Sequence, residues 1–184
     1  MEKFLELLNS LDIDYEIQDG TVIVKNKLTI EELDDVKQIS IPENTNFWNG
    51  LRCNWTDGEI QLPKNLNVGH ILDLENTNVT RLPSNLTIYG DCSVYLNAHK
   101  IKNVSYSDNC GDYQRTIFAF WANDDFLIAA GCFAGTYSRF ERRVNEEYHD
   151  TTEASVYKRK ARGCISRVAK KLGKPDPFKK VTAK

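Results

Sequence analysis

Two consecutive stretches of the chain, QLPKNLNVGHILDL at residues 61–74 and RLPSNLTIYGDCSV at residues 81–94, share one layout. At an offset of 20 residues, the matched positions are Leu62-Pro63-x-Asn65-Leu66-x-Val68 with Leu82-Pro83-x-Asn85-Leu86-x-Ile88, and Leu72-x-Leu74 with Cys92-x-Val94. The layout extends backwards at an offset of 21, with Ile41-Pro42-x-Asn44 over Leu62-Pro63-x-Asn65, Phe47 over Val68, and Leu51-x-Cys53 over Leu72-x-Leu74. Three repeat units are therefore visible in the sequence.

Each unit contains short elements in which apolar residues alternate with other residues, a pattern typical of β-strands. A strand of this length is too short to bury itself. Equivalent strands are therefore expected to stack into a parallel ribbon with one continuous apolar interior. We expect Phe47, Val68 and Ile88 to lie together in that interior. Pro63 and Pro83 fall in the connecting turns, where a missing amide hydrogen does no harm.

The N-terminal segment predicts a cap for this stack. In KFLELLNSL, residues 3–11, apolar residues recur at helical spacing, as expected for an amphipathic helix. Such a helix would cover the unpaired apolar end of the first unit. Residues 21–30, TVIVKNKLTI, are rich in β-branched residues and predict a strand. With the repeats, these segments make up the first predicted domain, residues 1–102.

The sequence changes in character from about residue 103. Two apolar runs, residues 116–122 and 126–132, are joined by Asn123-Asp124-Asp125, which predicts a β-hairpin. Two amphipathic helices are expected to follow the hairpin. The predicted second domain is residues 103–174, a β-hairpin with two helices, and residues 175–184 are expected to form a loose basic tail.

The ends of the two C-terminal helices are predicted from their capping residues. Thr136 is a good N-cap for a helix that continues to about Tyr148. Either Thr151 or Thr152 begins the next helix. Gly173 ends it, because glycine readily adopts the left-handed conformation that closes a helix.

The repeat units, of the form L-P-x-N-L-x-V-G-x-x-L-x-L, resemble the leucine-rich-repeat-like proteins common among bacteriophage and bacterial open reading frames. The stretch AAGCFAGTYSRFERRV, residues 129–144, is similar to the C-terminal module often attached to such arrays in phage proteins. The resemblance implies phage origin and an α+β fold. That fold is a short leucine-rich-repeat-like parallel β-solenoid with an N-terminal capping helix, followed by a β-hairpin plus two-helix module. The resemblance implies no catalytic residue.

Composition indicates a globular protein in a reducing compartment, and the host cytoplasm is expected for a phage product. Of the 184 residues, 41% are hydrophobic and 27% charged, and no apolar run approaches the ~20 residues of a membrane span. Five scattered cysteines without a C-x-x-C pair argue against a zinc site, and no cofactor is indicated.

The Asn-x-Ser/Thr triplets are interpreted as turn and strand-edge residues, and they begin at Asn54, Asn78, Asn85 and Asn103.

Positive charge is concentrated at the C-terminus. The net charge is −2, but residues 158–184 carry eleven lysines and arginines against the single acid Asp176, a net of +10 that leaves −12 for residues 1–157. Solvated helices usually interleave opposite charges, and this segment does not. Its predicted binding residues are Lys158, Arg159, Lys160, Arg162, Arg167, Lys170 and Lys171. They indicate contact with nucleic acid, with an acidic protein surface, or with the acidic remainder of the chain.

Cys132 is the strongest enzymatic candidate, because GCFAGT places a thiol just before a helix start, where thiolate is favoured. The favoured interpretation is that Cys132 is instead the last inward residue of a strand. Its base would have to be one of the histidines, which are His70, His99 and His149. None has a spacing that recommends it. Similarly, an acid–base or metal cluster of His70, Asp73 and Glu75 is less expected than a solvated strand face with Asp73 outward.

The sequence supports three hypotheses on function. The first is a non-enzymatic phage binding protein that docks on a host nucleic-acid-handling or defence complex and inhibits it, with a CRISPR effector as one such target; it rests on the resemblance. The alternative is a nucleic-acid-binding module that uses the basic helix directly. The third is a thiol enzyme centred on Cys132. The expected partner is a host or phage protein complex, with contact to nucleic acid and not to a membrane. The last repeat unit would be capped by the C-terminal module or by a second copy, and both remain open.

Overall fold

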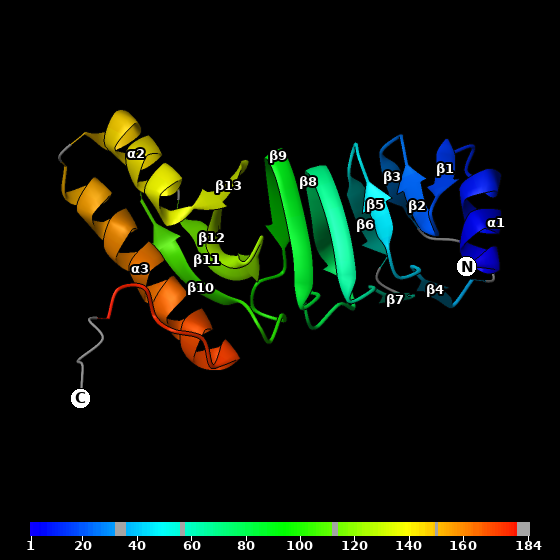
Figure 1. Cartoon of the computed structure of the whole chain (residues 1–184). Coiled ribbons are helices and arrows are strands. Elements are labelled where there is room, and N and C mark those ends of the chain that lie inside the picture. Colours follow the sequence, from blue (N-terminus) through cyan, green and yellow to red (C-terminus); the bar gives the residue numbers. More distant parts are fainter. Residues whose placement is uncertain (32–35, 56–57, 112–113, 150, 180–184) are drawn as a thin grey trace.

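The computed structural model describes residues 1–31, 36–55, 58–111, 114–149 and 151–179. This part of the chain has a mixed α+β architecture (Figure 1). A parallel β-solenoid of about three turns lies between an N-terminal helix and a C-terminal module made of an antiparallel sheet and two helices. The predicted solenoid, N-terminal helix, β-hairpin and C-terminal helices are thus confirmed.

The solenoid strands are β1 (Tyr15–Gln18), β2 (Thr21–Val24), β3 (Leu28–Ile30), β4 (Gln38–Ser40), β5 (Thr45–Phe47), β6 (Leu51–Trp55), β7 (Glu59–Gln61), β8 (Asn65–Thr77) and β9 (Asn85–Leu96). The strands of the module are β10 (Ser105–Cys110), β11 (Arg115–Ala122), β12 (Asp125–Ala130) and β13 (Phe133–Thr136). The helices are α1 (Glu2–Ser10), α2 (Tyr137–Tyr148) and α3 (Thr152–Leu172).

The repeats stack as the sequence predicts. Strands β2, β5, β8 and β9 pair in parallel, and their register places Phe47 beside Val68 and Val68 beside Ile88. All three side chains are buried in one continuous core. The α1 helix covers the first coil, where Phe4 packs edge-on against Phe47 with ring centroids 6.4 Å apart. The amphipathic helix therefore caps the stack, because its apolar side supplies the core that a preceding coil would otherwise provide.

The predicted register is wrong beyond the corner of the last coil. Gly69 pairs with Tyr89, at the expected offset of 20, but Leu72 pairs with Val94 and not with Cys92. The last coil therefore has two extra residues at its corner. The predicted strand at residues 21–30 is likewise bent into β2 and β3, which lie on different sides of the coil.

The module's own sheet closes the C-terminal end of the solenoid. Along β11, Phe118 and Phe120 face the solenoid core, whereas Ile117 and Ala119 face α2 and α3. The alternation of a β-strand thus gives one sheet two buried faces. The core consequently continues without interruption across the predicted boundary after residue 102.

The tip of the β11–β12 hairpin strengthens this junction. Asn123 and Asp124 have φ angles of 56° and 54°, as in the two-residue turns that suit hairpins. The Asn123 carboxamide donates from Nδ2 to the Ile88 carbonyl (2.6 Å), and its Oδ1 accepts from the Ile88 amide (2.7 Å). The Asn123 amide also donates to the carbonyl of Leu86 (3.0 Å). The hairpin tip therefore satisfies backbone groups that a further coil would have paired.

The C-terminal helices begin and end at the predicted residues. Thr136 and Thr151 are their N-caps, and Gly173, with φ of 64°, ends α3. The chain beyond α3 differs from the loose tail expected from residue 175. The Phe178 ring packs against Tyr137 with centroids 4.9 Å apart, so this part of the tail is folded back onto α2. Residues 180–184 lie outside the described part of the chain.

Candidate functional site

The seven predicted binding residues of α3 divide into three groups. One group lies along the edge of strand β10, a second faces α2, and a third points into solvent. The groups follow from helix geometry, because residues three, four or seven positions apart share a side of the helix. The sequence predicts that the seven residues form one surface, whereas in the structure they face three different surroundings.

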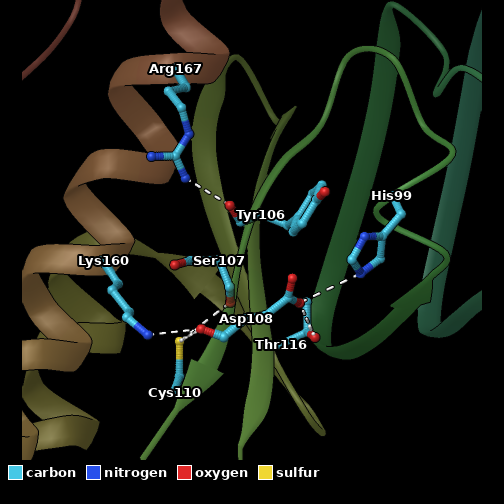
Figure 2. A network of polar contacts seen from close by, with 8 residues as sticks. All are labelled: His99, Tyr106, Ser107, Asp108, Cys110, Thr116, Lys160 and Arg167. Atoms are coloured by element: carbon cyan, nitrogen blue, oxygen red, sulfur yellow. Dashed lines mark hydrogen bonds and ion pairs between the residues drawn. The ribbon is translucent and has the colours of Figure 1, made fainter.

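Lys160, Arg167 and Lys171 lie along β10, which is the edge strand of the module's sheet. Figure 2 shows the first two of these side chains. Lys160 Nζ donates to the carbonyls of Asp108 (2.8 Å) and Asn109 (2.7 Å). Arg167 Nη2 donates to the Tyr106 carbonyl (2.7 Å), and its Nε donates to the Ser105 hydroxyl (2.7 Å). Lys171 Nζ donates to the Val104 carbonyl.

These contacts have a simple geometric origin. The carbonyls of residues 104, 106 and 108, at alternate positions in β10 and just before it, point to the same side, where no strand of the described residues pairs with β10. An unpaired strand edge is a template for unwanted pairing, and positively charged side chains protect it. Three cations of α3 therefore replace the missing neighbour. Sequence analysis missed this role because SYSDNC, the sequence of β10, has few strand-forming residues.

Lys158 and Arg162 face α2. Lys158 Nζ donates to the side-chain oxygen of Asn145 (2.9 Å). The Arg162 guanidinium donates to the Tyr137 hydroxyl (2.7 Å) and to Glu141 Oε1 (3.1 Å). It also lies over the ring of Tyr137, 5.2 Å from the centroid. Arg162 thus joins the two helices through an ion pair, a hydrogen bond and a cation–π contact.

The remaining cations are exposed. Within the described residues, no side-chain hydrogen bond or ion pair holds Arg159 or Lys170. Lys100 and Lys102 are also exposed, and they precede Val104, the residue that Lys171 contacts. Neighbouring Cα atoms are about 3.8 Å apart, so the Cα atoms of Lys102 and Lys100 lie within about 8 and 15 Å of that of Val104. We define the cationic face as Lys100, Lys102, Lys160, Arg167, Lys170 and Lys171.

An aromatic pair borders the cationic face. The rings of His99 and Tyr106 have centroids 4.1 Å apart and are tilted by 45° (Figure 2). The His99 side chain is 54% exposed, and its Nε2 lies 3.5 Å from Asp108 Oδ1. The same Asp108 oxygen accepts a hydrogen bond from the Thr116 hydroxyl (2.7 Å). Asp108 therefore holds the imidazole in place, across β10 from the cations of α3 (Figure 2). Tyr106 was not predicted as a site residue, and His99 was considered only as a base for Cys132, because the loop and strand that join them were not recognised.

The positive charge of α3 is not cancelled by carboxylates. The helix has seven lysines and arginines against one acid, Glu153, a net of +6. Among the described residues, Arg162 is the member of the seven that forms an ion pair, with Glu141. Backbone carbonyls orient Lys160, Arg167 and Lys171 without removing their charge, and each ammonium or guanidinium keeps further donors for a ligand. The face therefore combines fixed geometry with uncompensated charge.

Cys132 lacks the environment of a catalytic thiol. It is exposed in the turn after β12, so its expected position as an inward strand residue is wrong. It borders a cavity of about 170 Å³, whose described lining includes Phe133, Arg143 and Tyr148 but no histidine. The other cysteines are buried, and burial raises the pKa of Cys53 to about 12 and that of Cys164 to about 11. The described lining of this cavity thus offers Cys132 no histidine as a base.

The solenoid residues considered for acid–base chemistry are surface residues. Asp73 points outward and pairs with Arg52 Nε at 3.1 Å, as expected for a solvated strand face. His70 is exposed at a corner with φ of 57°. Within the described ranges, no three His, Cys, Asp or Glu side chains cluster so that they could hold a metal ion. None of the described helices has both the length and the hydropathy that a membrane crossing requires.

Comparisons with known proteins identify no relative. The sequence matches no protein-family model, and neither the curated proteins nor the solved structures contain a significant match to it.

Proposed function

We propose that this protein is a non-enzymatic binding protein and that its cationic face binds nucleic acid. The observation that carries the proposal is the uncompensated positive charge of α3. Among the described residues, Arg162 is the one of its seven lysines and arginines that pairs with a carboxylate. Phosphates interact with lysine and arginine through charge, largely independently of sequence.

The hydrogen bonds to β10 favour this function further. Free lysine and arginine side chains lose conformational entropy when they bind a ligand. Lys160, Arg167 and Lys171 are already held by backbone carbonyls, so less entropy remains to be lost. Pre-ordered cations therefore bind a polyanion more tightly than the same charges on a mobile tail.

The test uses two exposed lysines that make no described side-chain contact, so that folding is not disturbed. The double variant Lys102→Gln/Lys170→Gln should bind a labelled oligonucleotide more weakly. The slope of log K against log salt should fall in magnitude by about 1–2. The control is Lys3→Gln/Lys27→Gln, which removes the same charge from exposed positions on α1 and the first coil. Equal affinities and slopes for the two double variants would overturn the proposal.

Two finer expectations remain proposals. The leucine-rich-repeat-like identity of the coils is supported by the recurrence of Leu-Pro-x-Asn-Leu at residues 62–66 and 82–86. Docking on a host complex is supported by Trp48, which is 48% exposed on the solenoid, since exposed tryptophan is enriched at protein interfaces. Affinity capture from host lysate, with and without nuclease, should retain a protein after nuclease treatment if the protein docks directly. Loss of every captured protein would count against direct docking.

A further inference from the structure

We infer that the cationic face takes single-stranded nucleic acid, with one base stacked on His99 and successive phosphates along Lys160, Arg167 and Lys171. This inference rests on the proposed function and names its ligand. It combines three observations: the row of cations, the exposed aromatic pair beside it, and the composition of the solvent side of α3.

The spacing of the cations suits one strand of nucleic acid. Lys171, Arg167 and Lys160 contact the carbonyls of residues 104, 106 and 108, which are two residues apart along β10. Two residues of a β-strand span about 6.8 Å. This is comparable to the separation of successive phosphates in an extended nucleic-acid strand. The three cations form a single row, which matches the single sugar-phosphate backbone of one nucleic-acid strand.

His99 offers a surface on which a base can stack. One side of the imidazole is covered by Tyr106, and the ring is held by Asp108, yet 54% of the side chain is exposed. Stacking on an aromatic ring requires a base with a free face. The bases of a duplex are stacked on one another and offer none, so the aromatic pair favours a single strand.

The solvent side of α3 is poorly suited to reading a duplex. Recognition helices present asparagine, glutamine or arginine to base edges in the major groove. Between Arg159 and Lys170, the side of α3 opposite its buried residues carries Gly163 and Ser166, while the exposed Arg162 and Arg167 flank it and are held by α2 and by the segment that contains β10. Gly163 and Ser166 contribute no long polar side chain. The cations beside β10 and the stacking pair thus account for the contacts of this face better than groove insertion does.

Fluorescence anisotropy with a labelled oligothymidine of about 16 nucleotides tests the inference. The comparison ligands are a duplex of the same length, an oligouridine, and an abasic strand with the same number of phosphates. The thymidine or uridine strand should bind at least about fivefold more tightly than the abasic strand, because stacking is lost without bases. The duplex should also bind more weakly than the base-containing strand.

The variant His99→Ala separates stacking from charge. It should weaken binding of the base-containing strand by about fivefold and leave the abasic strand unchanged. The control His70→Gly removes an exposed histidine from the solenoid and should change neither affinity. Equal binding of abasic and base-containing strands, or tighter binding of the duplex, would overturn this inference while the proposed function stands. If Lys102→Gln/Lys170→Gln also has no effect, the proposed function falls with it.

Discussion

The side chain of Asn103 forms two hydrogen bonds with the backbone of Leu82. Its Nδ2 donates to the Leu82 carbonyl (3.0 Å), and its Oδ1 accepts from the Leu82 amide (2.9 Å). Both residues are buried. A carboxamide has the donor and acceptor of a peptide group, so Asn103 takes the place of the next strand on this side of the last coil, as Asn123 does for Ile88.

The substitution Asn103→Ala should therefore be costly. It leaves a buried amide and a buried carbonyl without partners, which we expect to lower the free energy of unfolding by about 2–3 kcal/mol. Urea denaturation measures this loss. Asn85→Ala is the matched control, because Asn85 donates to the side chain of Asn65 (2.8 Å) at an exposed site. It should cost less than about 1 kcal/mol. Equal losses would show that Asn103 does not replace a strand.

Removing a cation from the β10 edge should also destabilise the protein. Arg167→Met deletes charge-assisted hydrogen bonds to Tyr106 and Ser105, and we expect a loss of about 1–2 kcal/mol. Lys170→Met, the exposed neighbour without a described side-chain contact, should change stability by less than about 0.5 kcal/mol. Urea titration of both variants distinguishes them. A stable Arg167→Met protein would mean that solvent satisfies the strand edge equally well.

Local patterns explain which parts of the solenoid could be predicted from the sequence. Phe47, Val68 and Ile88 were placed correctly because apolar alternation and the proline turns fix the stacking within each coil. The corner was misaligned because Cys92 and Val94 are both buried, and an apolar pattern does not reveal a shift of two residues.

Only part of the cationic face could be predicted from the sequence, for a different reason. A helix shows which of its residues share a side, and on that basis the cations of α3 were identified. What each side faces depends on contacts with residues that are 13 positions away for Lys158 with Asn145 and 67 positions away for Lys171 with Val104. The polar strand β10 owes its conformation to β11 and to α3, so its own sequence gave no signal of the edge or of the His99–Tyr106 pair.

Thiol reactivity should distinguish Cys132 from the other cysteines. Cys132 is exposed, whereas Cys53, Cys92, Cys110 and Cys164 are buried. Burial raises the pKa of Cys92 to about 11, which keeps the thiol protonated and unreactive near neutral pH. Ellman's reagent should therefore titrate one thiol rapidly in the native protein and five in denaturant.

The variant Cys132→Ser provides the control for this titration. It should abolish the rapid phase and leave the affinity for oligonucleotides unchanged, because Cys132 lies outside the cationic face. A loss of binding on this substitution would favour a functional thiol.

Glu43 should make stability depend on pH in the acidic range. Its carboxylate accepts hydrogen bonds from the amides of Lys64 (2.9 Å) and Asn65 (3.2 Å), and these lower its pKa below the ordinary value of 4.5. A carboxyl group with a lowered folded-state pKa stabilises the protein above its unfolded-state pKa, and this contribution is lost as the pH falls through the folded-state value. Wild type should therefore exceed Glu43→Gln in melting temperature at neutral pH, and the difference should shrink as the pH falls below 4.5 and through the folded-state pKa. A difference that does not vary with pH would exclude a role for the charge.

At two neighbouring corners of the solenoid, we expect substitutions to change the stability in opposite directions: replacing Gly90 should lower it, and replacing His70 should raise it. Gly90 has φ of 70°, and a Cβ atom added there would meet nothing within 4 Å, so Gly90→Ala tests backbone strain alone. It should cost about 1 kcal/mol. His70 adopts a similar φ of 57° at the preceding corner with an exposed side chain. His70→Gly should therefore stabilise the protein by about 0.5–1 kcal/mol, because relief of left-handed strain exceeds the extra freedom that glycine gives the unfolded chain. Thermal melts of both variants measure the two effects. If His70→Gly is less stable than wild type, the histidine side chain must contribute contacts that offset its strained backbone.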